Sequence, residues 1–234
     1  MVTQKKISKT KRLWSEVQGD PELDRRISLG PVNTLSLLKD PKHLGFTLSR
    51  YKFAAKMLHD RKKIVDIGCG EGIGCLVLNA ETKAEIIGVD FDPEQIAYAE
   101  SWIKPHIRAE FMCRDLTCNK LNIKGADGLV SIDAIEHVYQ DEQDRFLENV
   151  LSCLSKDGVA VFGTPSVYSY EYTAERSRKG HVNMFDEKRL EHVLSQYFRH
   201  VFVFSMNDEM VHTGFSKMAH YFIALCCGKI GNGR

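Results

Sequence analysis

The sequence predicts an α/β fold in which a parallel sheet carries helices on both faces. Two observations indicate this class. Short apolar stretches alternate along the chain with segments whose apolar residues recur every three or four positions, the pattern of strands that alternate with helices. One apolar stretch, residues 64–67, runs directly into a glycine-rich segment, and apolar residues resume at Leu76. Such a pattern indicates a buried strand, a tight turn and the start of a helix.

The glycine-rich segment is the most informative part of the chain. Its glycines stand at alternate positions 68, 70, 72 and 74. Glycine lets the backbone approach a ligand closely and adopt positive φ, and the helix start beyond it offers unpaired N–H groups. The third glycine of a nicotinamide-binding G-x-G-x-x-G would fall at Ile73 or Cys75, and the Gly-Lys-Ser/Thr of a phosphate-binding loop does not occur. The segment therefore predicts a ligand turn of another kind.

Composition excludes several classes of protein. A chain of 234 residues suits one large domain with appendages. Its net charge of +1 indicates neither a nucleic-acid-binding nor a membrane-binding surface. The 7 cysteines include no C-x-x-C pair, which argues against a zinc site or a disulfide framework and favours reduced thiols in the cytoplasm. We find no apolar run long enough to span a membrane and no signal core.

The elements follow in order from the patterns. Residues 1–20 read as a basic tail, because five positive charges and no acid lie within residues 1–12; a solvated terminus is the commoner case for such tails. A helix start is expected at Asp20-Pro21. Further helices are expected at 46–58, 73–79, 93–103, 141–154 and 186–197, strands at 64–67, 85–90, 108–113, 127–132, 159–163, 198–206 and 221–227, and a loop at 166–184.

Four short motifs occur in a fixed order. They are residues 65–72 (VDIGCGEG), 88–92 (GVDFD), 113–116 (CRDL) and 131–138 (SIDAIEHV). This set resembles the class I S-adenosylmethionine-dependent methyltransferases, in particular small-molecule enzymes of the type 11/12 kind, over roughly residues 60–165. The resemblance implies a Rossmann-like, seven-stranded, mostly parallel sheet that a C-terminal antiparallel hairpin closes. It also implies S-adenosyl-L-methionine as the cofactor.

The strand-end acid Asp90 is the candidate ribose ligand. It lies 22 residues after Gly68, the device that dinucleotide-binding enzymes use for ribose hydroxyls, and Asp92 serves better than Asp90 as a helix cap. The resemblance adds that Phe91 lies against the adenine, that Asp115 accepts from its amino group, and that Leu116 packs on the ring. The remaining cofactor residues that it implies are Asp66, Gly68, Cys69, Gly70, Gly72 and Asp133.

Two histidines are the candidate catalytic bases. Methyl transfer to a hydroxyl or ammonium group needs a proton acceptor, and histidine is the commonest choice. His137 follows the fourth strand, and His181 lies beyond the 166–184 loop's cations; the sequence does not choose between them. No metal is expected, because Asp133 and Glu136 have no third acid close in the sequence.

The acceptor is expected to be a small molecule that offers an oxygen or nitrogen atom. The Pro-Pro-aromatic and Pro-Cys motifs of DNA methyltransferases do not occur. A sugar or sugar nucleotide of surface polysaccharide synthesis is our first hypothesis. Two arginines and two tyrosines of the 166–184 loop suit a phosphate-bearing acceptor: Arg176, Arg178, Tyr168 and Tyr170. An edge strand is the other interpretation of the tyrosines.

Two other functions stay open at this point. The chain could be an RNA methyltransferase that uses its basic tail, or a non-catalytic cofactor-binding scaffold protein. We divide it into a tail and helical cap, residues 1–60, and a methyltransferase domain, residues 61–234. The sequence predicts no oligomeric state.

Overall fold

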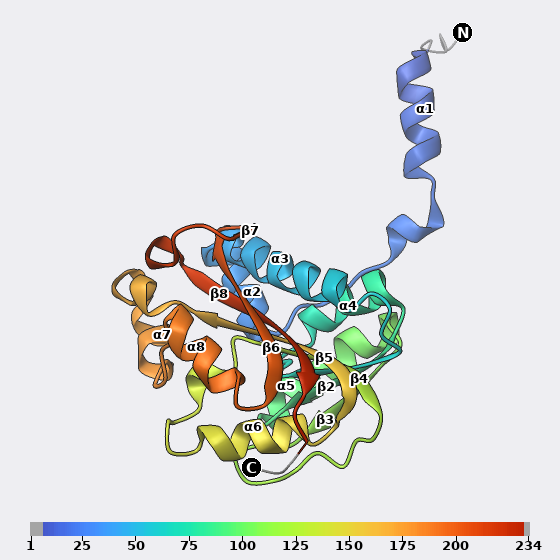
Figure 1. Cartoon of the computed structure of the whole chain (residues 1–234). Coiled ribbons are helices and arrows are strands. Elements are labelled where there is room, and N and C mark those ends of the chain that lie inside the picture. Colours follow the sequence, from blue (N-terminus) through green and yellow to red (C-terminus); the bar gives the residue numbers. More distant parts are fainter. Residues whose placement is uncertain (1–6, 232–234) are drawn as a thin grey trace, which may run out of the picture.

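A computed structural model describes residues 7–231 and contains one mixed sheet between two layers of helices (Figure 1). The strand order is β3-β2-β1-β4-β5-β8-β6-β7. The strands are β1 Lys63–Ile67, β2 Glu85–Asp90, β3 Ala109–Cys113, β4 Ala126–Ile132, β5 Leu154–Pro165, β6 Phe198–Asn207, β7 Met210–His212 and β8 Tyr221–Lys229. The first five strands are parallel to one another. Strand β8 pairs with β5 in antiparallel fashion, and β6 pairs with β8 in antiparallel fashion. The predicted class and the antiparallel C-terminal pair are confirmed.

The sheet has eight strands where seven were predicted. The additional strand, β7, has three residues and pairs with the end of β6. A segment this short shows no alternating pattern, so the sequence did not reveal it.

Neighbouring residues of each central strand enter two different cores. Ile64 packs in the layer of α3 (Pro41–Met57), α4 (Ile73–Thr82) and α5 (Pro93–Tyr98), whereas Val65 faces α6 (Gln143–Leu151) and α8 (Glu187–Leu194). Successive side chains of a strand point to opposite faces, so strands buried on both sides read as continuous apolar runs. This is why the strands were easy to find.

The N-terminal prolines begin helices. Pro31 opens α2 (Pro31–Lys39) and Pro41 opens α3, while Pro21 begins the short 3₁₀ turn η1 (Pro21–Asp24). Proline suits the first turn of a helix because its missing N–H would have no partner there. Helix α3 packs Tyr51 and Ala54 into the core. Residues 41–57 are therefore part of the globular body.

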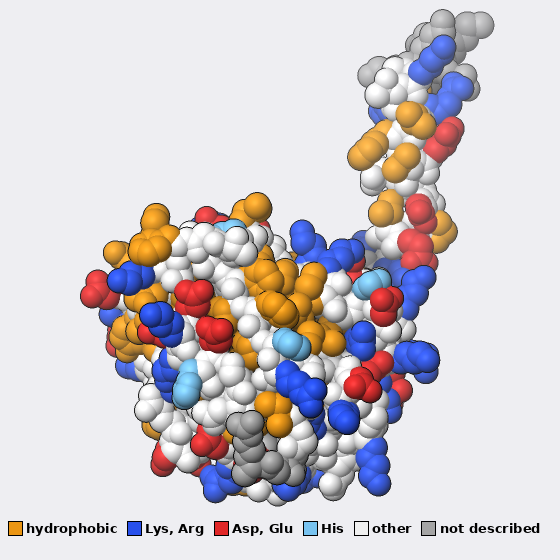
Figure 2. Space-filling view, in the orientation of Figure 1, with side chains coloured by type: hydrophobic (Ala, Val, Ile, Leu, Met, Phe, Trp, Pro, Cys, Tyr) orange, Lys and Arg blue, Asp and Glu red, His pale blue; other side chains and the backbone are white. Residues whose placement is uncertain are grey.

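Residues 9–18 of the predicted basic tail contain a helix that the sequence analysis did not predict. They form helix α1 (Lys9–Gln18), whose N-terminus is capped by Ser8 through a 3.2 Å hydrogen bond from the Lys11 amide. The helix stands clear of the body (Figures 1 and 2). It buries no side chain and exposes Leu13 and Trp14. Lys5 and Lys6 lie outside the described residues.

Much of the 166–184 segment, which we predicted to be a loop, is helical. It comprises the 3₁₀ turn η5 (Val167–Tyr172) and the short helix α7 (Glu175–Gly180), so the edge-strand interpretation was wrong. Other short turns are the π-helical η2 (Ala99–Ile103), which continues α5, and the 3₁₀ turns η3 (Lys104–His106), η4 (Ile135–His137) and η6 (Ser216–Met218). Among the described residues, we find no helix with the length and apolar character of a membrane span.

Strand order and register place the functional motifs at one edge. Strand β1 lies between β2 and β4, and Ile67 pairs with both Val89 and Ser131. The chain therefore leaves all three strands at the same carboxyl edge. In open α/β sheets, ligands bind at this edge where the strand order reverses, which here is between β1 and β4.

Candidate functional site

A cavity of about 140 Å³ opens at the reversal point between β1 and β4. The glycine turn and the residues after β4 form one side of it, and α2 and α3 form the other. Its polar lining includes Asn33 of α2, Thr47 of α3, Gln95 of α5 and Asp133 beyond β4. Such a mixture of backbone and convergent polar groups is typical of a small-molecule site.

Three turn glycines adopt left-handed backbone conformations. Their φ angles are 73° at Gly68, 53° at Gly70 and 83° at Gly72, values that residues with a side chain rarely adopt. A Cβ on Gly68 would approach Ala134 Cβ to 2.8 Å, whereas at Gly70 the nearest atom is Gln95 Oε1, 3.7 Å away. Gly68 is thus needed for packing. Gly70 faces open space, as a backbone cradle for a ligand requires.

Asp90 accepts two backbone hydrogen bonds at the end of β2. Its oxygens bind the Gly70 and Asp92 amides, each at 2.9 Å. Asp92 in turn caps α5 through Glu94, as expected. A carboxylate has about four acceptor positions, so Asp90 keeps acceptor capacity after fixing the turn. Beside it, the Phe91 ring is 72% exposed.

Asp115 and Leu116 lie in different environments. Asp115 is exposed, and hydrogen bonds from the Thr117 hydroxyl and amide, at 2.7 and 2.9 Å, hold the pKa of its carboxyl below the ordinary value. Leu116 is only 5% exposed and belongs to the core on the α6 side. Neither residue lines the cavity. Their adenine contacts stay predictions.

Asp66 is buried beneath the glycine turn. Its oxygens accept from the Tyr51 hydroxyl at 3.2 Å and from the Cys75 thiol at 3.4 Å. Burial is the main cause that raises the pKa of Asp66 to about 7, because a charge without water is unfavourable.

Glu71 ties helix α2 to the turn. Its carboxylate, which is almost fully buried, accepts from the Val32 amide at 2.7 Å and from the amide and side chain of Asn33 at 3.0 and 2.7 Å. An anion at a helix N-terminus satisfies its unpaired N–H groups. The contact closes one wall of the cavity.

An ion pair closes the opposite wall. Arg50 of α3 lies 2.7 Å from Asp133 and stacks on Tyr221, 3.8 Å from the ring centroid. Asp133 adopts φ 54°, which is unusual for a residue with a side chain. The backbone there aims the carboxylate at the cavity and Arg50 holds it.

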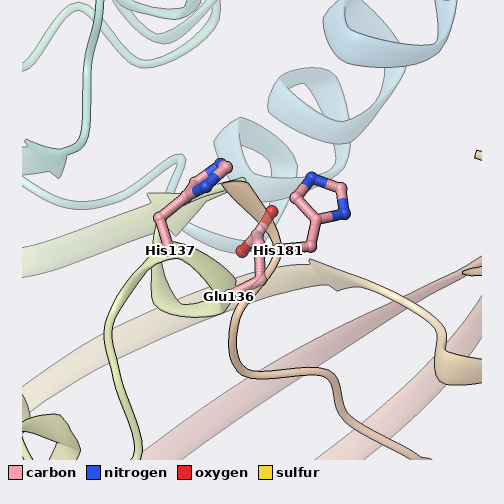
Figure 3. Close-up of side chains that lie close together, drawn as sticks. All are labelled: Glu136, His137 and His181. Atoms are coloured by element: carbon pink, nitrogen blue, oxygen red, sulfur yellow. The ribbon is translucent and has the colours of Figure 1, made fainter. Parts of the chain in front are cut away.

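Both predicted histidines lie in one cluster beside this wall. The imidazole rings of His137 and His181 are 5.1 Å apart, and Figure 3 shows the Glu136 carboxylate close to both. Burial and the nearby Asp133 charge hold the pKa of Glu136 well above its ordinary value. Burial also lowers the pKa of His181. Which of the two imidazoles acts as the base stays a prediction.

The predicted acceptor residues lie on the segment that leads to His181. Tyr168 and Tyr170 are on η5, and Arg176 and Arg178 are on α7, all exposed to solvent. Helix α7 ends at Gly180, whose carbonyl lies 2.9 Å from His137 Nδ1. None of the four lines the cavity within the described chain.

Sequence reasoning missed Arg50, Glu71 and Tyr221. Arg50 carried a signal, since it interrupts an apolar helical pattern between Leu48 and Tyr51. Glu71 lies among the glycines of the turn, but its hydrogen-bond donors on α2 cannot be identified from the sequence. Tyr221 read only as a strand residue.

Comparisons with known proteins agree with this geometry. Residues 64–158 match the family described as "Methyltransferase domain". A phosphoethanolamine N-methyltransferase of Plasmodium falciparum (isolate 3D7) is 24% identical over 101 residues, 43% of this chain and 38% of that enzyme. The chain thus matches well under half of that relative's length.

Solved structures are similar in fold. The plantazolicin methyltransferase BpumL, in complex with SAH and a monoazolic desmethylPZN analog, has a TM-score of 0.63 and 14% identity, over 92% of this chain and 94% of that chain. The N-methyltransferase NodS from Bradyrhizobium japonicum WM9, in complex with SAH, has a TM-score of 0.61 and 15% identity, over 82% of this chain and 90% of that chain.

Proposed function

We propose that this chain is a class I S-adenosylmethionine-dependent methyltransferase that methylates an oxygen or nitrogen atom of a small molecule. One observation carries the proposal. The glycine turn, Asp133 and polar groups of α2 and α3 surround a single cavity at the sheet's reversal point, and the His137–His181 pair lies beside it. Similar proteins whose names describe N-methyltransferases or a methyltransferase of plantazolicin support the same class.

S-adenosyl-L-methionine fits the residues at this edge, where it would supply a methyl group on a positively charged sulfur. The backbone at Gly70, where a side chain would meet only Gln95, would receive its amino-acid half next to Asp133, with Asp66, Gly68, Cys69 and Gly72 shaping the turn. Asp90, with acceptor capacity left, would bind the ribose hydroxyls. The exposed Phe91 ring would cover the adenine, near Asp115 and Leu116.

We assign the acceptor side to the cluster that contains His137 and His181. In the reaction, the acceptor's oxygen or nitrogen forms a bond to the methyl carbon, the sulfur leaves with the electron pair of the broken bond, and the acceptor loses one proton. A group that accepts this proton, or that weakens the bond between the proton and the acceptor atom, has to lie beside that atom. The two imidazoles are placed for that task next to the Asp133 wall.

The acceptor is, in our proposal, a sugar or sugar nucleotide. Arg176 and Arg178 put two exposed cations on the helix that ends at the histidines, and arginine suits phosphate. Tyr168 and Tyr170 precede them with exposed rings. Residues 21–60 act as a cap over this space, since α2 is fastened to the turn by Glu71.

Calorimetry with S-adenosylhomocysteine tests the cofactor assignment. Asp90→Ala removes hydrogen bonds to an ionised acceptor, each of which contributes about 1.5–3 kcal/mol, so affinity should fall about 10- to 100-fold. Glu94→Ala, an exposed acid one turn away, is the matched control. A dissociation constant within twofold of the parent in Asp90→Ala would refute the assignment. A panel of sugar nucleotides with mass-spectrometric detection of methylation tests the acceptor class.

A second candidate function has one observation in its favour. Helix α1 projects from the body (Figure 1) and exposes Lys9, Lys11, Arg12 and Trp14, a combination of cations and an aromatic ring that suits RNA. Deletion of residues 1–18 should then weaken RNA binding and flatten its salt dependence. Equal RNA affinity with and without these residues would remove this candidate.

A further inference from the structure

We propose that Glu136, His137 and His181 together bind a divalent transition-metal ion. Each side chain offers one ligand atom, and these atoms all lie within 4.8 Å of one another. Figure 3 shows the three side chains around a common space, with Glu136 and His137 on η4 and His181 after α7. The ion's role in catalysis rests on the proposed function, but its binding does not.

Two buried atoms of the cluster have no partner among the described residues. Glu136 is 0% exposed, and its Oε1 accepts no hydrogen bond, while Oε2 has only the Thr164 hydroxyl at 3.3 Å. His181 Nδ1 is likewise buried and unpartnered. An unsatisfied buried polar atom is unfavourable, and more so when it is charged. A cation between them would satisfy both.

His137 is oriented as a metal ligand would be. Its Nδ1 lies 2.9 Å from the Gly180 carbonyl. A carbonyl oxygen only accepts, so Nδ1 carries the proton and the neutral ring keeps a lone pair at Nε2. Metal-bound histidines usually donate their other ring N–H to a carbonyl or carboxylate in this way.

The backbone holds the second half of the cluster in place. The amides of Val182 and Asn183 donate to the Glu136 carbonyl at 2.9 and 3.1 Å. One segment, residues 180–183, therefore both orients His137 and carries His181. Its attachment to η4 makes the three ligands a preformed group, because the turn that bears Glu136 also receives these bonds.

The ligand set selects the kind of ion. Two imidazoles and one carboxylate with open positions suit Mn²⁺, Fe²⁺, Co²⁺ or Zn²⁺, whereas Mg²⁺ and Ca²⁺ prefer oxygen ligands. Ligands about 2.1 Å from one ion lie at most about 4.2 Å apart, so the atoms must draw slightly closer. His137 is exposed and has room to turn. Arg50 is paired with Asp133, so no salt bridge occupies the Glu136 carboxyl within the described chain.

Bound there, the ion would lower the pKa of an acceptor hydroxyl that occupies an open position. The proton that the reaction releases would then pass to water, and neither imidazole would need to accept it. The inference thus favours hydroxyl acceptors over amines.

Titration of the untagged, metal-free full chain with Co²⁺ tests binding without cofactor or acceptor. We expect one ion per chain, with the visible absorption bands of a nitrogen- and oxygen-ligated ion. His137→Ala and His181→Ala should each weaken binding at least tenfold, while His200→Ala, an exposed histidine on β6, should not. Glu136→Gln tests the carboxylate. Since Glu136 is buried and its substitution can disturb folding, His137→Ala, at an exposed position, provides a second test of the site. S-adenosylhomocysteine affinity reports whether each variant is folded.

Two results would overturn the proposal. One is no Co²⁺ binding up to millimolar concentration by a chain that still binds S-adenosylhomocysteine. The other is equal Co²⁺ affinity in His181→Ala and His200→Ala. A chain that binds Co²⁺ as predicted but does not bind S-adenosylhomocysteine would refute the proposed function and leave the metal site intact.

Discussion

Asp66 gives a pH dependence that the structure lets us calculate. Its pKa is raised from 3.8 to about 7, mainly by burial. The groups that face it are Tyr51 of α3, Cys75 of α4 and, at longer range, Asp90. The folded chain holds the proton more tightly than the unfolded chain, so the stability from protonated Asp66 is complete at low pH. It falls as the pH rises from about 4 through about 7.

The size of the effect follows from this shift. Integrated over the titration, the loss is about 1.7 kcal/mol at pH 5 and about 4.3 kcal/mol at pH 8, a difference of roughly 2.5 kcal/mol. Asp66→Asn has no charge to bury and should not show this loss. The advantage of Asp66→Asn over the parent should therefore grow by about 2.5 kcal/mol from pH 5 to pH 8, or about 5–10 °C in Tm.

Denaturant unfolding at several pH values measures this difference directly. Other carboxylates titrate in both proteins, so their contributions cancel in the comparison. Asp141→Asn, an exposed acid, is the matched control and should run parallel to the parent. A difference between Asp66→Asn and the parent that stays constant within about 0.5 kcal/mol, or that shrinks as the pH rises, would refute the reasoning.

Three further predictions concern the turn, the cap and the acceptor segment. Gly70→Val should reduce S-adenosylhomocysteine affinity in calorimetry, because φ 53° is strained for a branched residue and the side chain would enter the cavity; undiminished affinity would contradict it. Glu71→Ala removes the carboxylate that holds α2, so limited proteolysis before α2 should accelerate about 10- to 100-fold, and unchanged cleavage would show that the cap is held otherwise. Arg176→Ala combined with Arg178→Ala should raise the acceptor KM and leave cofactor affinity intact. An unchanged KM would show that these arginines do not contribute to acceptor binding.

The sequence by itself determined the fold class and the local features at which we propose that the cofactor binds. Its parallel strands are buried on both faces, so they appear as apolar runs that need no knowledge of partners. The glycine turn, Asp90 and the cap at Asp92 are local features within about 25 residues, and the structure places them as their order predicted. The family match over residues 64–158 confirms the resemblance.

Only the tertiary structure decided the acceptor side. Arg50 meets Asp133 across 83 positions, and His137 meets Gly180 across 43; no local pattern encodes which distant residues will meet. The exposed helix α1 was missed for another reason. Its apolar residues Leu13, Trp14 and Val17 follow helical spacing, but the basic residues around them were interpreted as a solvated tail. Folding brings His181 close to Glu136, whose Oε1 has no hydrogen-bond partner in the described chain. The sequence alone does not show that these two residues are neighbours.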